Sequence, residues 1–235
     1  MSEMSEDLIF QELLQAFTIK FAMGSLEDEN IIQIRHELAE YTASQFLEAA
    51  DEIVIQNKGK ETEKESQAIS ILLKIGASLV SGASKLFQTS NAYAAAALVR
   101  QLVEIEYLAW AFEDNKQEAE RWIDSSKDER MKFFTPAKLR QADQGRFRGK
   151  DYGYHCELGG HPVPEAGLLL NNPHRTAQLL LSDMLGHSGR IWDHLVRWAD
   201  GEVKQDAILS RKEQMLTRYV AWKEKDFTTR LPPPP

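Results

Sequence analysis

The chain lacks three features that would place it outside the cytoplasm: paired cysteines, a long apolar run and a leader segment. Its one cysteine, Cys156, cannot form an internal disulfide, and a lone thiol beside six histidines is typical of a reducing compartment. No stretch approaches the roughly 20 consecutive apolar residues that a membrane span needs. Residues 1–7 are acidic and contain no basic segment followed by an apolar run. We therefore expect a cytoplasmic protein that makes no contact with a membrane.

Strand-like alternation is also scarce, whereas apolar residues recur at steps of three and four along most of the 235 residues. This spacing predicts an all-α helical bundle. The expected helices cover residues 10–21, 25–55 (capped by Ser25), 61–87, 92–112 and 115–125, then a long helix that opens at Asn172–Pro173 and a last helix over 202–225. Residues 98–112 are apolar nearly all round, which predicts a central position in the bundle.

The pattern divides the chain into three parts. Residues 1–58 are expected to form an N-terminal helical pair that packs on the bundle, residues 59–228 the main bundle, and residues 229–235 a Pro-rich tail. Within residues 1–70, 15 acids oppose five bases, which gives this part a charge of −10. Such an acidic surface favours a contact with a second copy of the chain or with another protein.

A basic stretch interrupts this acidic chain, whose net charge is −8. Residues 130–150 contain seven bases, including Arg140, and one acid, Asp143, which gives a charge of +6. Local positive charge on an acidic protein favours a site for RNA or another phosphate-bearing ligand, although a solvated loop rich in Lys and Arg is an equally good interpretation.

The basic stretch leads into residues 146–164, which we call the cassette. Its nineteen residues hold two arginines, two histidines, two acids, two tyrosines and the single cysteine, bracketed by Gly and Pro. Reactive side chains on such a background are typical of a functional site. Four of them are the catalytic candidates, namely Arg148, Asp151, Tyr152 and His155.

The spacing of these candidates suggests a chemistry. Arg148 and His155 are seven residues apart, so on a continuous helix they lie within about 20° of each other, with Tyr152 between them. An arginine that holds a phosphate and a histidine that moves protons are the minimum equipment for cleaving RNA through its own 2′-hydroxyl without a metal or other cofactor. Gly149 and Gly153 leave open that the segment is a turn instead.

Other polar residues are candidates for binding or for support of the site. Arg100 and Glu104 share one face of the central helix with Tyr107. Their structural interpretation is an i,i+4 ion pair in which the two charges satisfy each other. Their functional interpretation is that this face is turned toward the cassette and supports its site. Arg140, Arg146, Glu157 and His161 complete the binding candidates. A polar stripe on the helix that follows Pro173 is interpreted mainly as solvated surface; its members are Asp183, His187, Arg190, His194 and Arg197.

An arginine followed by six residues and a histidine in a helical bundle resembles the HEPN superfamily of helical nucleotide-binding and RNase domains. Arg148 and His155 carry this resemblance, which covers about residues 60–200, and Gly149 replaces the polar residue that commonly follows the arginine. The resemblance implies a four-helix core, metal-independent endoribonuclease activity in a toxin or phage-defence setting, and a site shared across a homodimer.

Three alternatives stay open on the sequence. His155, Glu157 and His161, with Glu104, could bind zinc or iron, although their spacing is poor for that purpose. Cys156 could act as a nucleophile, although no familiar signature surrounds it. A bundle with an acidic N-terminal part could also be an adaptor, scaffold or antitoxin without any catalytic chemistry.

Overall fold

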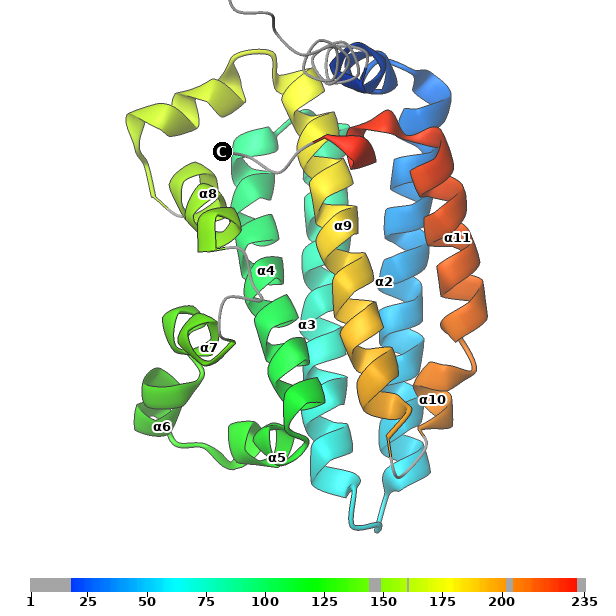
Figure 1. Cartoon of the computed structure of the whole chain (residues 1–235), viewed down its shortest axis with the longest axis vertical. Helices are drawn as coiled ribbons and strands as arrows, with labels where there is room; N and C mark the ends of the chain where they lie inside the picture. The colour runs from blue at the N-terminus through cyan, green and yellow to red at the C-terminus, as the bar shows by residue number, and fades with distance from the viewer. Residues whose placement is uncertain (1–17, 144–148, 160, 202–204, 232–235) are drawn as a thin grey trace, which may run out of the picture.

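The computed structural model describes residues 18–143, 149–159, 161–201 and 205–231. Within these ranges every regular element is a helix and no strand is present, which confirms the all-α prediction. Four long helices form the centre of the molecule: α2 (Glu29–Asn57), α3 (Glu63–Gln88), α4 (Ala92–Asp114) and α9 (Pro173–Ala199). Figure 1 shows them side by side, with α2, α4 and α9 running in one direction and α3 in the other.

Shorter elements cover two sides of this bundle. Between α4 and α9 the chain forms α5 (Gln117–Asp124), α6 (Lys127–Phe133), α7 (Pro136–Ala142), α8 (Gly149–Gly159) and the 3-10 helix η1 (Pro164–Leu170). These elements lie along the outer side of α4 (Figure 1). After α9 come α10 (Asp206–Leu209), α11 (Lys212–Lys225) and η2 (Phe227–Arg230), and α11 packs beside α2. Because α4 and α9 are parallel, their connection must return along the whole bundle, and it carries the cassette.

Side-chain caps explain most helix starts. Asn91 caps α4, whose start agrees with the helix expected over 92–112, and Asn172 caps α9 with Pro173 in its first turn, as the sequence predicts. The cap of α2 is Asp28 and not Ser25, since the Asp28 carboxylate accepts hydrogen bonds from two backbone N–H groups of the first turn. The last long helix begins at Lys212 and not near 202, and the basic stretch contains α6 and α7, two short helices that the sequence pattern did not indicate.

One hydrophobic core joins all four long helices. Leu102 and Phe112 of α4 have no exposed surface, in agreement with the central position predicted for this helix, whereas Leu108 is only partly buried. Phe46 of α2 is buried in the same core, so α2 is an integral member of the bundle. The first 58 residues were predicted to form a helical pair that packs on the bundle, and α2, which belongs to this part, shares the core with α3.

A buried ion pair ties α2 to the end of the chain. The Arg35 guanidinium donates to Asp226 through Nε at 2.7 Å and Nη2 at 2.8 Å, and neither side chain is exposed. Asp226 also accepts a hydrogen bond from the Trp222 indole. Burial alone would raise the pKa of Asp226. The hydrogen bonds from Arg35 and its positive charge keep this pKa below its usual value.

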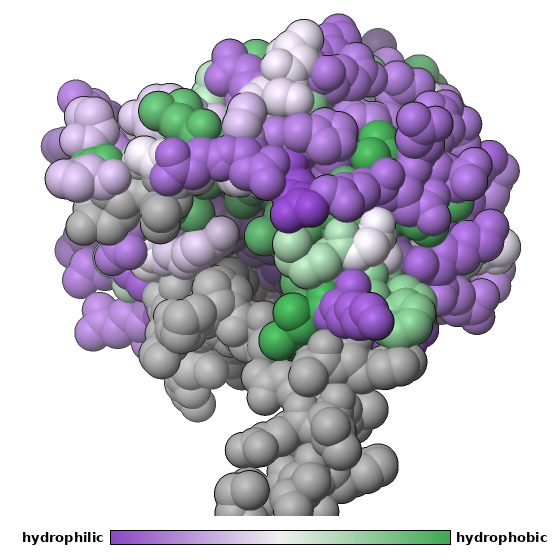
Figure 2. Space-filling view, turned by 90° about the horizontal axis from the view of Figure 1, so that it is seen from above, coloured by the Kyte–Doolittle hydropathy of each residue, from purple (hydrophilic) through white to green (hydrophobic). Residues whose placement is uncertain are grey.

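Hydrophilic residues cover most of the described surface at the end of the molecule seen in Figure 2. Within the described residues α3 is the one helix long and apolar enough to cross a membrane, and 56% of the relevant window is buried inside the bundle. Burial of that kind is what the core helix of a bundle requires.

Candidate functional site

The cassette enters the structure as α8, so its central residues do lie on a continuous helix. The C-terminal end of α8 touches α4, where Gly159 lies directly against the backbone of Ala96 and a Cβ atom would overlap the Ala96 carbonyl group. This close approach needs glycine. His155, one turn earlier, is therefore held against the bundle and has only 2% of its surface exposed.

His155 meets two residues of α9. Its Nε2 atom lies 3.1 Å from Nε2 of His187 and 3.2 Å from Oδ2 of Asp183. Asp183 and His187 are one turn apart on α9, with 3.7 Å between Oδ1 and Nε2. His187 is 1% exposed, whereas the Asp183 side chain is 34% exposed. Three potential metal ligands from two helices thus converge with all their ligand atoms within 4.8 Å of one another.

The central helix supplies a partner that fixes the orientation of His187. Glu106 of α4 is 4% exposed, and its Oε2 atom lies 2.6 Å from Nδ1 of His187. The other oxygen, Oε1, accepts a hydrogen bond from Nε of Arg190 at 2.7 Å. A carboxylate accepts only, so the contact with Glu106 requires the proton on Nδ1 of His187, an atom that also lies 2.7 Å from Nη2 of Arg190. In the neutral ring the Nε2 lone pair then faces Asp183 and His155.

Charge and burial act in opposite directions on these groups. Burial alone would raise the pKa of Glu106, but the charge of His187, the hydrogen bond from it and the charge of Arg190 lower it to about 2. Burial would likewise raise the pKa of Asp183, but His187, His155 and Arg190 lower it to about 2. Burial and Arg190 depress the pKa of His187, yet Asp183 and Glu106 outweigh them and raise it. Both carboxylates are therefore ionised, and the neighbouring histidines and Arg190 stabilise their negative charge.

The contact between Glu106, His187 and Arg190 occurs twice along the same two helices. Two turns further on, His194 Nδ1 lies 2.5 Å from Glu113, and Nε of Arg197 donates to Glu113 at 2.6 Å. The separation along the chain is 81 residues for both Glu–His pairs and 84 residues for both Glu–Arg pairs. A constant offset requires parallel helices in register, and it marks the Glu–His–Arg unit as a structural clamp between α4 and α9.

The two clamps differ in what surrounds the second nitrogen of the histidine. At His187 that nitrogen faces Asp183, one turn earlier on α9, and His155. The residue one turn before His194 is Arg190, which is a cation and already belongs to the first clamp. His194 is also more exposed, at 13%. Among the described residues, the one group of three potential metal ligands includes the histidine of the first clamp, His187, and none of the second clamp.

The distances in this group agree with those of a metal centre. Two ligands of a tetrahedral zinc ion, each about 2.0 to 2.1 Å from the metal, lie about 3.3 Å apart. The separations of 3.1, 3.2 and 3.7 Å, the last two to different oxygens of Asp183, lie near that value. Oδ2 of Asp183 is buried, and Nε2 of His155 lies 3.2 Å from it without forming a well-aligned hydrogen bond. A cation between these atoms would satisfy the carboxylate oxygen.

The other predicted residues form a neighbouring polar cluster. Arg100 donates to Glu104 at 2.9 Å, which confirms the i,i+4 pair, and the Tyr152 hydroxyl donates to Glu104 at 3.2 Å, so this face of α4 also faces the cassette. The Arg140 guanidinium stacks 4.6 Å above the Tyr152 ring. Burial raises the pKa of Tyr152 to about 12, so its hydroxyl stays protonated.

The remaining sequence candidates do not join the centre. Arg146, Arg148 and the side chain of Asp151 lie outside the described residues. Glu157 and His161 are exposed, and the metal set His155, Glu157 and His161 is not among the ligand groups of the described part of the chain. Cys156 is a half-buried free thiol.

The polar stripe of α9 corrects one prediction. Its residues, Asp183, His187, Arg190, His194 and Arg197, were interpreted as mainly solvated surface, but they contact α4 and α8 instead. Sequence reasoning did not single out Glu106 at all. The signal that could have found it is the repeat of seven residues shared by Glu106 and Glu113 on α4 and by His187 and His194 on α9.

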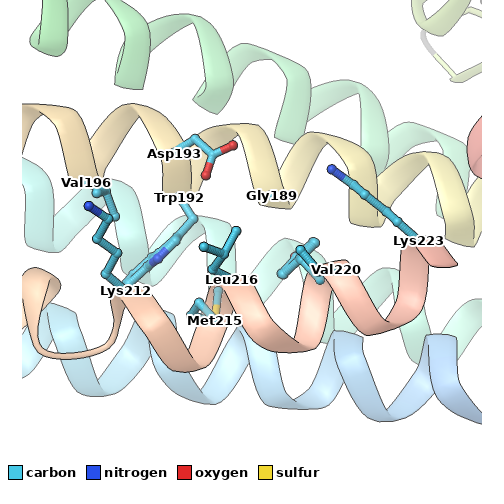
Figure 3. Close-up of a pocket in the computed structure, with 10 residues that line it drawn as sticks. Gly189, Trp192, Asp193, Val196, Lys212, Met215, Leu216, Val220 and Lys223 are labelled. Carbon is cyan, nitrogen blue, oxygen red and sulfur yellow. The ribbon is translucent and has the colours of Figure 1, made fainter.

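A second depression lies between α9 and α11 and is shown in Figure 3. Its walls are mainly apolar, with Trp192, Met215, Leu216 and Val220, and the charged Asp193, Lys212 and Lys223 at its rim. Its described lining contains no group of three metal-ligating side chains. The centre formed by α8, α9 and α4 is therefore the stronger candidate.

No protein-family model, curated protein or solved structure matches the chain.

Proposed function

We propose that this protein binds one divalent transition-metal ion between α8 and α9 and uses it for hydrolysis. The observation that carries the proposal is the convergence of His155, His187 and Asp183, whose ligand atoms all lie within 4.8 Å of one another. Two imidazoles and one carboxylate are ligands that suit zinc, and they also suit non-haem iron.

The number of ligands supports a reactive and not a purely structural ion. Structural zinc sites have four protein ligands, whereas catalytic sites have three and keep a position for water or substrate. An ion held by His155, His187 and Asp183 would supply an activated water for hydrolysis near neutral pH. The partly exposed Asp183 gives solvent a route to the open position.

Glu106 is the partner expected of a metal-bound histidine. Ligating histidines commonly donate their second ring N–H to a carboxylate, which fixes the tautomer and strengthens the ligand. The contact of 2.6 Å between Glu106 and Nδ1 of His187 has this geometry. Arg190 in turn holds Glu106, so the orientation of His187 rests on two helices.

Metal binding is tested on the purified, chelator-treated protein by calorimetric titration with zinc and by the visible spectrum of cobalt. We expect one ion per chain and an intense cobalt spectrum typical of a four-coordinate site. His187→Ala and Asp183→Asn should lose both signals. His194→Ala removes the equivalent histidine of the second clamp and should keep them. If zinc binds equally well to all of these proteins, the ion lies elsewhere and the proposal is wrong.

A second candidate is the metal-free RNA cleavage that the HEPN resemblance implies. The specific observation in its favour is the direct contact of 3.1 Å between the Nε2 atoms of His155 and His187, since two imidazoles can share and pass a proton. RNA incubated with the protein separates the candidates. Cleavage that persists in EDTA and is lost in His155→Ala supports the metal-free reaction, whereas cleavage that needs added zinc or manganese supports the metal centre.

A further inference from the structure

The exposed part of the proposed centre lies along one edge of α9. His155, His187 and Glu106 are buried, whereas the side chains of Asp183 and Arg190 are 34% and 47% exposed. A ligand that reaches the open position of the ion must therefore approach between these two residues. Arg190 is the cation that such a ligand meets first.

The neighbourhood of Arg190 directs its guanidinium along this edge. Its Nε atom donates to Glu106, Nη2 lies 2.7 Å from Nδ1 of His187, and Nη1 lies over Gly186, where an added Cβ atom would be 3.5 Å away. Gly186 lies between Asp183 and Arg190 on the same face of α9. The side chain therefore extends back along the helix toward Asp183, and nearly half of it faces solvent.

The charges of a loaded centre do not balance. The two positive charges of the ion and that of Arg190 exceed the negative charges of Asp183 and Glu106 by one, when both imidazoles are neutral ligands. A net charge in a largely buried position is costly unless it is compensated. The ligand that completes the centre is therefore expected to carry one negative charge.

More positive charge lies one turn away along α8. Tyr152 lies between the guanidinium of Arg140, stacked on its ring, and Glu104, which pairs with Arg100. The Nε atoms of Arg100 and Arg140 are buried and have no hydrogen-bond acceptor in the described structure. The two guanidinium groups with one carboxylate leave one positive charge here, which a chain of phosphate groups would approach and a single carboxylate would not.

We propose that the open position of the metal centre takes a phosphate group, as a phosphodiester in the substrate, with one oxygen on the ion and another accepting hydrogen bonds from Arg190. A phosphodiester carries the single negative charge that the centre requires, and Nη1 of Arg190 can donate a charge-assisted hydrogen bond to it. The inference rests on the proposed metal centre and names the substrate class of that site.

The test is a titration of the cobalt-loaded protein with inorganic phosphate, followed by the visible absorption of the ion. Phosphate should displace the bound water and shift the spectrum of the wild-type protein. Arg190→Gln should need about 10 to 100 times more phosphate, because a hydrogen bond to a charged group contributes about 1.5 to 3 kcal/mol. Arg197→Gln, the same change in the second clamp, should match the wild type.

Each outcome bears on a different claim. A protein that shows no cobalt spectrum contradicts the metal centre itself. A normal cobalt spectrum that phosphate leaves unchanged overturns the inference and leaves the metal centre intact. A larger shift with acetate than with phosphate assigns a carboxylate ligand and also overturns it.

Because Arg190 also holds Glu106, Arg190→Lys is measured alongside Arg190→Gln. It retains the positive charge but loses the planar pair of donors, so its phosphate affinity should fall between those of the wild type and Arg190→Gln. Equal phosphate affinities in the Arg190 and Arg197 variants, each with an intact cobalt spectrum, would remove Arg190 from the site.

Discussion

Glu106→Gln is the substitution that separates a metal-binding clamp from a purely structural one. The carboxylate has a pKa of about 2 and is charged at neutral pH, so the substitution removes a full negative charge beside His187 and Arg190. In a glutamine one of the two oxygens becomes an NH2 group that donates, so either His187 or Arg190 would face another donor. Glu113→Gln makes the same change in the second clamp and is the matched control.

Two magnitudes follow from the positions of these residues. Loss of the carboxylate partner of a ligating histidine typically weakens metal binding by 10 to 100-fold, which is about 1.4 to 2.7 kcal/mol. Breaking a buried ion pair costs about 3 to 5 kcal/mol of folding stability, and Glu106 has 5% of its side chain exposed against 24% for Glu113. Glu106→Gln should therefore lower both zinc affinity and stability, whereas Glu113→Gln should lower stability by less and leave zinc affinity unchanged.

The assay is a competition between the protein and a chromophoric chelator for zinc, with urea unfolding of the metal-free proteins measured in parallel. Affinity is compared only at urea concentrations where each protein is folded. Equal zinc affinity in Glu106→Gln and Glu113→Gln would refute the reasoning, because the two clamps would then be equivalent in function as they are in geometry.

Three further predictions concern the scaffold. Because the folded state lowers the pKa of Asp226, its pair with Arg35 stabilises the protein above the unfolded carboxyl pKa of about 3.9, and this stabilisation is lost as the pH falls through the lower folded value. Thermal unfolding measured against pH should show the loss, and Asp226→Asn should remove this pH dependence. Gly159→Ala should push α8 away from α4, so zinc affinity should fall while the circular dichroism spectrum stays helical; unchanged affinity would contradict the role given to this contact. Leu102→Ala should cost about 2 to 5 kcal/mol in chemical unfolding and Leu108→Ala clearly less, and equal losses would argue against the central packing of α4.

Local sequence signals determined much of the scaffold. The 3.6-residue periodicity gave the all-α class and the central place of α4, and the asparagine caps gave the starts of α4 and α9. The pair of Arg100 and Glu104 was predictable because its partners lie one turn apart on one helix. The same local rules misplaced the start of α2, since Ser25 and Asp28 are both good caps and only the geometry of the turn selects Asp28.

The sequence also drew attention to His155, but its partners could not be read from it. Asp183 and His187 form a polar stripe whether α9 turns it toward solvent or toward α4, because helical periodicity defines a face and not what covers that face. Glu106 and His187 meet across 81 residues, and that contact depends on the parallel register of α4 and α9. Register is set by the packing of whole helix surfaces in the core. The amino-acid sequence by itself therefore determined the helices and the reactive segment, and the tertiary structure alone decided which of their charged side chains form one centre.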